Sequence, residues 1–283
     1  MTMTVPVSVD GMRAVLDIMR GAASRQIMPR FRRLDSTSIR CKTSPLDVVT
    51  EADEAAEREI AAALRHLSPG AVVIGEEAAC ARPDLLDALG HAELAYVVDP
   101  IDGTANYAAG VPLFGVMVAA VVRGEVAGAA ILDPVCDVAA LAVRGEGAWL
   151  AGPDGAERAL SVASPVAAEA MSGNASWRYL NPAIRDTVAH NLPRVLGSWD
   201  FRCAAHEYLM IADAKCHFLL FNRTLPWDHL AGWLIHREAG GYCAHFDGSP
   251  YRVTDREGGL LYAPDRASWQ DLYDLLMERP SGP

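Results

Sequence analysis

Hydrophobic residues recur along this chain with two different spacings, and each spacing predicts a different kind of element. Apolar positions three and four residues apart predict helices over about 9–33, 50–67, 182–192, 204–214, 228–239 and 267–277. Short and nearly continuous apolar runs predict strands at 72–74, 94–98, 115–122, 126–132, 138–143, 148–150, 216–221, 242–246 and 260–262. Weaker patterns indicate a helix at 84–89, extended pieces near 170–172 and 194–196, and a loop around a short extended piece at 39–50.

Two helix ends carry recognisable capping residues. Thr50-Glu51-Ala52-Asp53 has the pattern of a capping box, in which the threonine and the acid three residues later satisfy each other's backbone N–H groups. Gly240 and Gly241 follow the helix predicted over 228–239, and glycine is the usual residue where a helix ends in the left-handed conformation.

The order of the elements predicts the fold class. The strands between 115 and 150 follow one another with only short turns, which predicts an antiparallel meander and argues against a purely parallel sheet. We expect an α+β fold of layered helices and sheets in one compact unit over 1–283. Its N-terminal lobe would span about 8–150 and its C-terminal lobe about 151–278.

Composition narrows the class of protein. Half of the 283 residues are apolar and the net charge is −11, so the chain can form a large core and is a poor candidate for binding nucleic acid. The apolar runs are too short to cross a membrane, and the N-terminus lacks the pattern of a secretion signal. The six cysteines have no metal-site spacing and look like small buried residues of a reducing compartment. We therefore expect a cytoplasmic protein.

The segment Asp99-Pro100-Ile101-Asp102-Gly103-Thr104 directly follows the buried strand over 94–98. Two carboxylates that leave the core together repel each other unless a cation lies between them, and their hard oxygens suit Mg²⁺ or Mn²⁺. The alternative is a simple turn, since aspartate, proline and glycine are all turn residues.

Other acids lie at similar element boundaries. Glu76 follows the strand over 72–74, Asp228 begins a predicted helix, and Asp47 and Asp53 lie near the start of the helix that Thr50 opens. Each of them alone is more often a solvated helix cap, but acids at strand ends and helix starts often converge on functional sites.

Several ordered motifs resemble the inositol monophosphatase family of Mg²⁺-dependent, lithium-sensitive phosphatases, over roughly residues 10 to 275. Gly75-Glu76-Glu77 resembles that family's G-E-E, and Asp99 to Tyr107 resembles D-P-I/L-D-G-T-x-N-F. Trp227 to Gly232, followed by Glu238 to Gly241, resembles W-D-x-A-A-G with E-A-G-G after it, and Lys42 to Asp53 resembles K-x-x-x-x-D-L/V-V-T-x-x-D. The resemblance implies a layered α-β-α-β-α sandwich of the sugar-phosphatase type and a homodimer.

The resemblance also implies roles for particular residues. It implies two or three Mg²⁺ ions, with Mn²⁺ as a substitute and Li⁺ as an inhibitor, and the metal ligands Glu76, Asp99, the Ile101 carbonyl, Asp102 and Asp228. Glu76 and Thr104 would orient the attacking water, with Asp53 as a further catalytic acid. Lys42, Asp47 and Asp53 would lie in a third metal site or around the first two. Asp53 is equally well explained as a capping acid, and Lys42 as a solvated loop lysine.

The predicted substrate pocket departs from the family pattern. Asp102, Gly103 and Thr104 suit phosphate capture, but Arg202-Cys203-Ala204-Ala205 stands where the family has G-S/T-A-A, and Phe221 stands where it often has a sugar-binding glutamate. Arg202 would bind a second anionic group or form a salt bridge with a nearby acid. Phe221 would line the pocket or belong to the core, and Arg223 lies in a loop where substrate contacts are plausible.

Two classes of function follow. The first is a Mg²⁺-dependent phosphatase of a small phosphomonoester, such as an inositol phosphate, another sugar or alcohol phosphate, histidinol phosphate or a 3′-phosphonucleotide. The second is a non-catalytic protein that keeps the fold and binds a metabolite or a partner.

Overall fold

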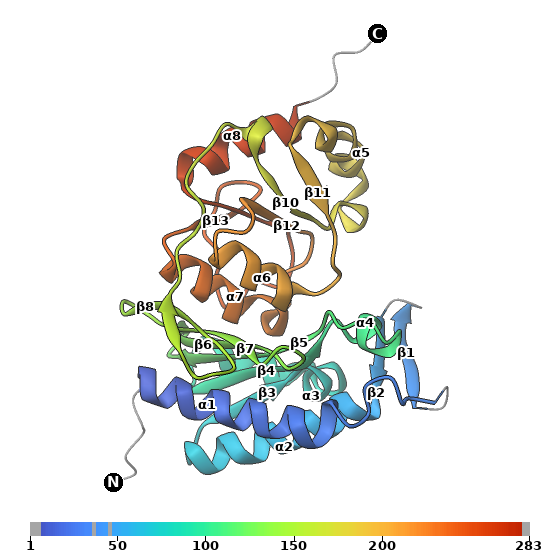
Figure 1. The fold of residues 1–283 in the computed structure, drawn as a ribbon, viewed down its shortest axis with the longest axis vertical. Coiled ribbons are helices and arrows are strands. Elements are labelled where there is room, and N and C mark those ends of the chain that lie inside the picture. The colour runs from blue at the N-terminus through green and yellow to red at the C-terminus, as the bar shows by residue number, and fades with distance from the viewer. Residues whose placement is uncertain (1–6, 36–37, 45–46, 279–283) are drawn as a thin grey trace.

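Five layers of helices and sheets stack along the long axis of the molecule (Figure 1). The computed structural model describes residues 7–35, 38–44 and 47–278, with only the backbone of residues 43, 44 and 47. Helices α1 (Val9–Ala22) and α2 (Glu51–Leu67) form one outer layer, and α5 (Pro182–Asn191) and α8 (Arg266–Met277) form the other. Helices α6 (Ala204–Ala212) and α7 (Pro226–Glu238) lie between the two large sheets, so the predicted five-layer α+β fold is confirmed.

A seven-stranded sheet forms the layer above α1 and α2. Its strands lie in the order β3-β4-β5-β6-β7-β8-β9, with β3 and β4 parallel and all other neighbours antiparallel. Their bounds are β3 Val72–Gly75, β4 Ala95–Asp102, β5 Gly115–Val122, β6 Glu125–Asp133, β7 Val138–Val143, β8 Gly147–Ala151 and β9 Glu157–Ala159. The meander predicted from 115 to 150 is confirmed, and β9 carries this sheet beyond residue 150.

A smaller mixed sheet of five strands supports the C-terminal half. Its order is β11-β10-β12-β14-β13, with β11, β10 and β12 parallel and β14 antiparallel to both of its neighbours. The bounds are β10 Ser172–Ala175, β11 Gly197–Trp199, β12 Phe218–Phe221, β13 Tyr242–His245 and β14 Leu260–Ala263. The extended piece predicted at 194–196 is wrong in position, because Leu192–Arg194 forms a 3₁₀ turn with a proline as its second residue and β11 starts after it.

Several short elements differ from the sequence predictions. Helix α1 ends at Ala22 and continues only as a π-helical turn over Ala23–Ile27, rather than as a helix to 33. The predicted loop at 39–50 is an antiparallel pair of strands, β1 (Ile39–Ser44) and β2 (Asp47–Thr50). The predicted helix at 84–89 is a 3₁₀ helix over Pro83–Gly90, and helix α3 (Glu76–Ala81) was not predicted. No helix in the described part of the chain combines the length and apolar character needed to cross a bilayer.

The cysteines differ in their burial. Cys203 and Cys216 are buried, as predicted, and Cys243 is half-buried. The prediction is wrong for Cys41, Cys80 and Cys136, which are exposed. Small apolar residues elsewhere fill the core, so these three positions do not need to be buried.

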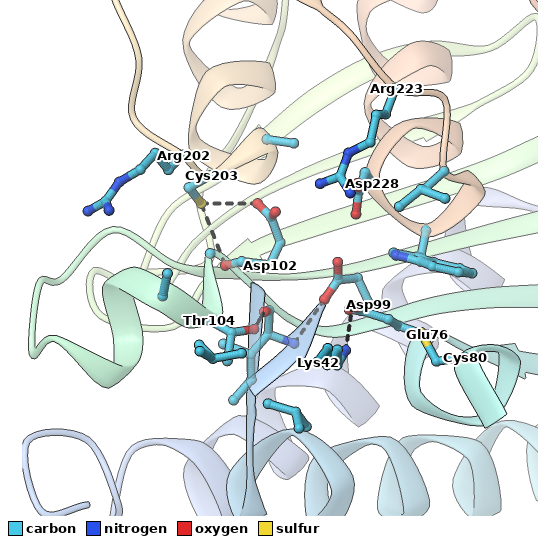
Figure 2. Close-up of a pocket in the computed structure, with 18 of the residues that line it drawn as sticks. Lys42, Glu76, Cys80, Asp99, Asp102, Thr104, Arg202, Cys203, Arg223 and Asp228 are labelled. Carbon is cyan, nitrogen blue, oxygen red and sulfur yellow. Dashed lines mark hydrogen bonds and ion pairs between the residues drawn. The ribbon is translucent and has the colours of Figure 1, made fainter. Parts of the chain in front are cut away.

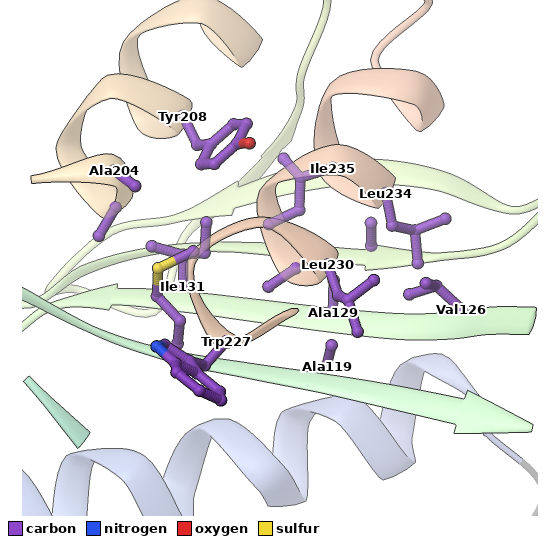
Figure 3. Close-up of a cluster of buried hydrophobic side chains, with 14 of the residues drawn as sticks. Ala119, Val126, Ala129, Ile131, Ala204, Tyr208, Trp227, Leu230, Leu234 and Ile235 are labelled. Carbon is purple, nitrogen blue, oxygen red and sulfur yellow. The ribbon is translucent and has the colours of Figure 1, made fainter. Parts of the chain in front are cut away.

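Helix α7 packs closely on the seven-stranded sheet because the strands below it carry small side chains. Figure 3 shows Leu230, Leu234 and Ile235 of α7 above Ala119 of β5 and Ala129 of β6. All five side chains are at most 2% exposed. A fully buried leucine or isoleucine contributes roughly 1.5–3 kcal/mol, so this contact holds α7 firmly on the sheet. The first turn of α7 is thereby fixed in position.

The contact between α6 and α7 depends on Gly232. A Cβ at this position would lie 2.0 Å from the ring of Tyr208, whose hydroxyl is 2.9 Å from His229 Nδ1 and donates to the Tyr262 hydroxyl at 2.7 Å. A side chain at 232 must therefore push Tyr208 out of a hydrogen-bonded and closely packed position.

We expect Gly232→Ala to lower the free energy of unfolding by about 1–3 kcal/mol, because it overpacks this contact. Urea unfolding of both proteins measures the difference. Gly197→Ala is the matched control, since the nearest atom to its Cβ would be at 4.0 Å, in ordinary contact. Equal stability of the two variants would contradict the packing described.

Candidate active site

Four acids from three elements line one cavity of about 670 Å³ (Figure 2). Asp99 and Asp102 lie at the end of β4, Glu76 is the first residue of α3, and Asp228 lies in the first turn of α7. Strands β3 and β4 are parallel neighbours, so α3 begins at the same sheet edge at which β4 ends. The fold therefore brings together the acids that the sequence placed at element boundaries.

A bulge in β4 positions Asp99 and Asp102 together. Asp99 pairs with Met117 and Asp102 pairs with Gly115, so β4 contains one more residue than β5 between these pairs. Residues three apart on a regular strand point to opposite faces, whereas an extra residue reverses this alternation. Pro100 lies inside the bulge, where a missing N–H group costs no ladder hydrogen bond.

The carboxylates of Asp99, Asp102 and Asp228 form the tightest group. One oxygen from each lies within 4.8 Å of the other two. The Ile101 carbonyl lies beside them and accepts a hydrogen bond from the Thr104 hydroxyl at 2.8 Å. Glu76 stands at the edge of this group, where its Oε1 lies 2.8 Å from Lys42 Nζ.

Burial and mutual repulsion oppose ionisation of this cluster. Burial, followed by the charge of Glu76, raises the pKa of Asp99 well above its usual range. Burial raises the pKa of Glu76 to about 8, although Lys42 opposes the rise and Asp228 adds to it. Burial raises the pKa of Asp228 to about 7, with a further contribution from Asp102. A divalent cation among these hard oxygen donors would remove the repulsion, so the donor set fits Mg²⁺ or a similar ion.

Asp102 also joins the two halves of the molecule. Its Oδ2 accepts a hydrogen bond from the Ala205 backbone N–H at 2.6 Å and from the Cys203 thiol at 3.0 Å, both at the start of α6. Gly103, next to it, has a φ of +83°, and a Cβ there would lie 2.9 Å from the Leu113 carbonyl oxygen. This junction therefore requires glycine both for its conformation and for space.

Thr104, which is half-buried, and Asp53, which is buried, form a hydrogen-bonded pair beside the cluster. The Thr104 hydroxyl lies 2.9 Å from Asp53 Oδ1 and also contacts the Ile101 carbonyl. Asp53 Oδ2 accepts the Thr50 backbone N–H at 2.9 Å, which completes the predicted capping box of α2. Burial raises the pKa of Asp53 to about 6 despite these hydrogen bonds. The carboxylate thus caps a helix and reaches Thr104 at the same time.

Lys42 is not the solvated loop lysine that was one alternative. It projects from β1 and its Nζ lies 2.8 Å from Glu76 and 2.7 Å from Glu77. Asp47 begins β2, and its side chain lies outside the described residues.

Residues of the C-terminal half form the opposite wall of the cavity. Arg202, Cys203, Ala204, Phe221 and Arg223 all line it. A guanidinium nitrogen of Arg202 donates to Asn106 Oδ1 at 2.7 Å, and among the described residues Arg202 has no salt bridge to an acid. Phe221 is both wall and core, since its ring lies 4.7 Å from the His229 ring and 5.4 Å from the Tyr208 ring, between centroids.

Sequence reasoning missed other members of this site. Glu77 shares Lys42 with Glu76, and Glu57 accepts the backbone N–H groups of Glu77 and Ala78 at 2.7 and 3.0 Å, which holds the start of α3. Glu207 lines the opposite wall, where burial raises its pKa well above the usual range. An acid within the apolar helix over 204–212 is a signal that could have identified Glu207, whereas no local pattern marks Glu57.

Comparison with known proteins agrees with the family resemblance of the sequence motifs. The model of the inositol monophosphatase family matches residues 11–278. The chain is 34% identical over 244 residues to the Nus factor SuhB of Pseudomonas aeruginosa, which covers 81% of this chain and 83% of that protein. It is 27% identical to the inositol-1-monophosphatase of Bacillus subtilis, over 81% of this chain and 84% of the relative. The solved structure of a Thermotoga maritima IMPase superposes with a TM-score of 0.78 over 95% of this chain and 99% of that one, at 23% identity.

The raised pKa values predict how metal-free stability depends on pH. Unfolded carboxyl groups titrate near pH 4, whereas Asp53, Asp228 and Glu76 titrate at about 6, 7 and 8 in the folded protein. The folded state therefore holds protons that the unfolded chain releases above about pH 4. This difference adds to the free energy of unfolding, and the added stability, complete below about pH 4, is lost as the pH rises to about 8. In a chelating buffer we expect the Tm to fall from pH 5 to pH 8.

Saturating Mg²⁺ should reverse that loss and raise the Tm at pH 8 by about 5 °C or more, as expected for a ligand at a hundred times its Kd. Calorimetric melting with and without Mg²⁺ measures both effects. The Asp99→Asn variant should lose most of the rise in Tm that Mg²⁺ causes. The Asp154→Asn variant, changed at an exposed turn, should retain it. A Tm that does not change when Mg²⁺ is added at pH 8 would contradict a metal site in this cavity.

Proposed function

Because the chain belongs to the inositol monophosphatase family, we propose that it is a Mg²⁺-dependent phosphatase of a small phosphomonoester. The observation that carries the proposal is the convergence of Asp99, Asp102 and Asp228 within 4.8 Å in a cavity large enough for a metabolite. An inositol-phosphate-like compound or another sugar or alcohol phosphate is the proposed substrate, with histidinol phosphate and a 3′-phosphonucleotide as alternatives.

The proposed ligands of the metal ions are Glu76, Asp99, Asp102, Asp228 and the Ile101 carbonyl. A bound divalent cation would polarise a phosphoryl oxygen and lower the pKa of a bound water molecule. Lys42 holds the Glu76 carboxylate in place through its ion pair at 2.8 Å. The Ala205 N–H group does the same for Asp102 at 2.6 Å, so both acids are oriented before any ligand binds.

The Thr104–Asp53 pair is proposed to accept the proton of the attacking water. The water oxygen forms a bond to phosphorus, the bond between phosphorus and the ester oxygen breaks, and the alcohol leaves with a proton from solvent. The Thr104 hydroxyl takes a proton from the water and passes its own to Asp53, 2.9 Å away. Since burial raises the pKa of Asp53 to about 6, this carboxylate is a stronger base than an exposed one and is still ionised at pH 7.

One relative supports a second candidate function. The Pseudomonas aeruginosa protein that is 34% identical is named as a Nus factor, so a role in a complex of Nus factors is an alternative for this chain. Such a role does not require the carboxylate cluster. If the chain acts in this way, Asp99→Asn should leave its association with the Nus factors of its host intact, as measured by co-purification.

A homodimer and a cytoplasmic location complete the proposal. Mn²⁺ is expected to replace Mg²⁺, because it accepts the same oxygen donors, and Li⁺ to inhibit by occupying the weaker metal position. Light scattering of the purified protein measures the oligomeric state directly.

Phosphate release from a panel of phosphomonoesters tests the proposed reaction. We expect release that requires Mg²⁺, and a loss of about a thousandfold or more in kcat for Asp99→Asn or Asp102→Asn, because each removes a charge that holds the metal ion. Asp154→Asn should behave like the unmodified protein. Equal release in the presence of a chelator would overturn the proposal.

Two substitutions separate the catalytic role of Asp53 from its capping role. Asp53→Asn should lower kcat by about a hundredfold or more, because it removes the base beside Thr104. Thr50→Ala removes the capping hydroxyl but keeps the Asp53 carboxylate, so it should lower stability by about 1 kcal/mol with little change in kcat. If both variants lose the same small amount of stability and keep full kcat, Asp53 is only a cap.

A further inference from the structure

A second cavity, of about 310 Å³, lies farther along α7 than the carboxylate cluster. Leu230 and Trp233 of this helix line it, whereas Asp228 lines the larger cavity. Its other walls come from the turn between β5 and β6, the start of β6, the turn after β7 and residues 251–254 between β13 and β14. In the described part of the chain no residue lines both cavities, so this one is a separate feature. Its volume suits a small molecule.

The charge of the second cavity is opposite to that of the whole chain, which carries a net charge of −11. Of the described residues that line this cavity, one is an acid, Glu125, and three are arginines, Arg123, Arg144 and Arg252. Arg123 has a partner at 2.6 Å in Glu93, which does not line the cavity. Arg252 is exposed and has no ion pair within the described ranges. Positive charge gathered at a hollow in an acidic protein favours an anionic ligand.

Arg144 is held in position and still has a hydrogen-bond donor without an acceptor. Its Nε donates to the Val126 carbonyl oxygen at 2.6 Å, and its guanidinium carbon lies 5.7 Å from the centroid of the Trp233 ring. Its Nη2 is shielded from solvent and lies 3.0 Å from Glu125 Oε2, but it makes no hydrogen bond. A guanidinium group that is already oriented loses less conformational freedom when it binds an oxyanion.

A second polar group at the same cavity also lacks a partner. Tyr251 is 6% exposed, and its buried hydroxyl makes no hydrogen bond with any described residue. The Tyr251 ring lies 6.1 Å from the Trp233 ring, between centroids, so Tyr251 and Arg144 contact the same indole. Buried polar groups normally have hydrogen-bond partners, so two such groups at one cavity indicate that a ligand supplies the acceptor. Both can donate, which suits the oxygens of an anion.

We infer that the second cavity binds a small molecule that combines an oxyanion, a carboxylate or a phosphate, with an apolar body. Arg144 and Tyr251 donate hydrogen bonds to the oxyanion, and Arg252 adds positive charge at the exposed edge of the cavity. The aliphatic side chains of Leu230 and Val253 line the cavity as well and suit the apolar body. This site does not depend on the proposed phosphatase function, because it shares no described residue with the larger cavity.

Calorimetric titration with four small probes tests the inference. Benzoate and phenylphosphonate combine a ring with a carboxylate or a phosphonate, benzyl alcohol has the ring without a charge, and acetate has the carboxylate without a ring. Metal-free buffer ensures that no metal ion at the carboxylate cluster binds the probe. We expect benzoate or phenylphosphonate to bind about tenfold or more tightly than benzyl alcohol and acetate, and the tighter of the two identifies the preferred oxyanion. If neither does so, the inference is overturned.

Three substitutions locate the bound probe. Arg144→Gln should weaken binding of the tighter anion about tenfold or more, because it removes the charged donor. Tyr251→Phe should weaken it about threefold or more and leave the Tm unchanged, because the hydroxyl has no partner in the unliganded protein. Glu125→Gln should strengthen it about twofold or more, because it removes a negative charge beside Arg144. Arg266→Gln, at the exposed start of α8, is the control and should bind like the unmodified protein.

Unchanged affinity in any of these three variants would overturn the inference, because the probe would then bind elsewhere or without the groups named. Thermal melting establishes that Arg144→Gln folds. If it does not fold, Arg144→Lys takes its place, since lysine keeps the charge but lacks the planar set of donors, and binding should still weaken about threefold or more.

Discussion

Repulsion between buried carboxylates is the constraint on which the rest of the site depends. Asp99, Asp102 and Asp228 come within 4.8 Å of one another at the wall of one cavity, with Glu76 beside them. Charges placed in this way raise one another's pKa, so the cluster holds protons near neutral pH unless cations replace them. The arrangement is costly for a fold without a metal ion and is suited to one that binds metal ions.

The surrounding structure keeps these groups from moving apart. The bulge in β4 directs Asp99 and Asp102 into one cavity, and the packing of α7 on the alanine-rich strands fixes Asp228. The start of α6 holds Asp102 through the Ala205 N–H group, so both halves of the molecule meet at one carboxylate. A cavity between the edge that carries the clustered acids and a wall from the C-terminal half follows from this layered arrangement, and it is the basis of the proposed function.

Sequence patterns predicted the layers and the candidate acids, but not how these acids are brought together in space. The meander, the capping box at Thr50 and the place of Asp228 in the first turn of a helix depend on local residues, and the structure contains them. The strand predicted over 94–98 is longer than expected, so Asp99 lies within β4 and Asp102 ends it. The convergence of the four acids was suggested by the family resemblance and not by spacing, since the bulge that turns Asp99 and Asp102 to one side depends on pairing with β5. Helix α3 is only six residues long and β11 only three, too short for a periodic pattern to appear. The ion pairs of Lys42 and the burial of Glu207 depend on distant elements and could not be deduced from their neighbours in the chain.

Proton release on metal binding tests the central claim most directly. Calorimetric titration of the protein with Mg²⁺ at pH 7, repeated in buffers of different ionisation enthalpy, measures how many protons leave as the ion enters. If cations are needed to ionise the buried carboxylates, about one proton or more should be released per protein. Binding of Mg²⁺ without proton release, or no binding at all, would contradict the account.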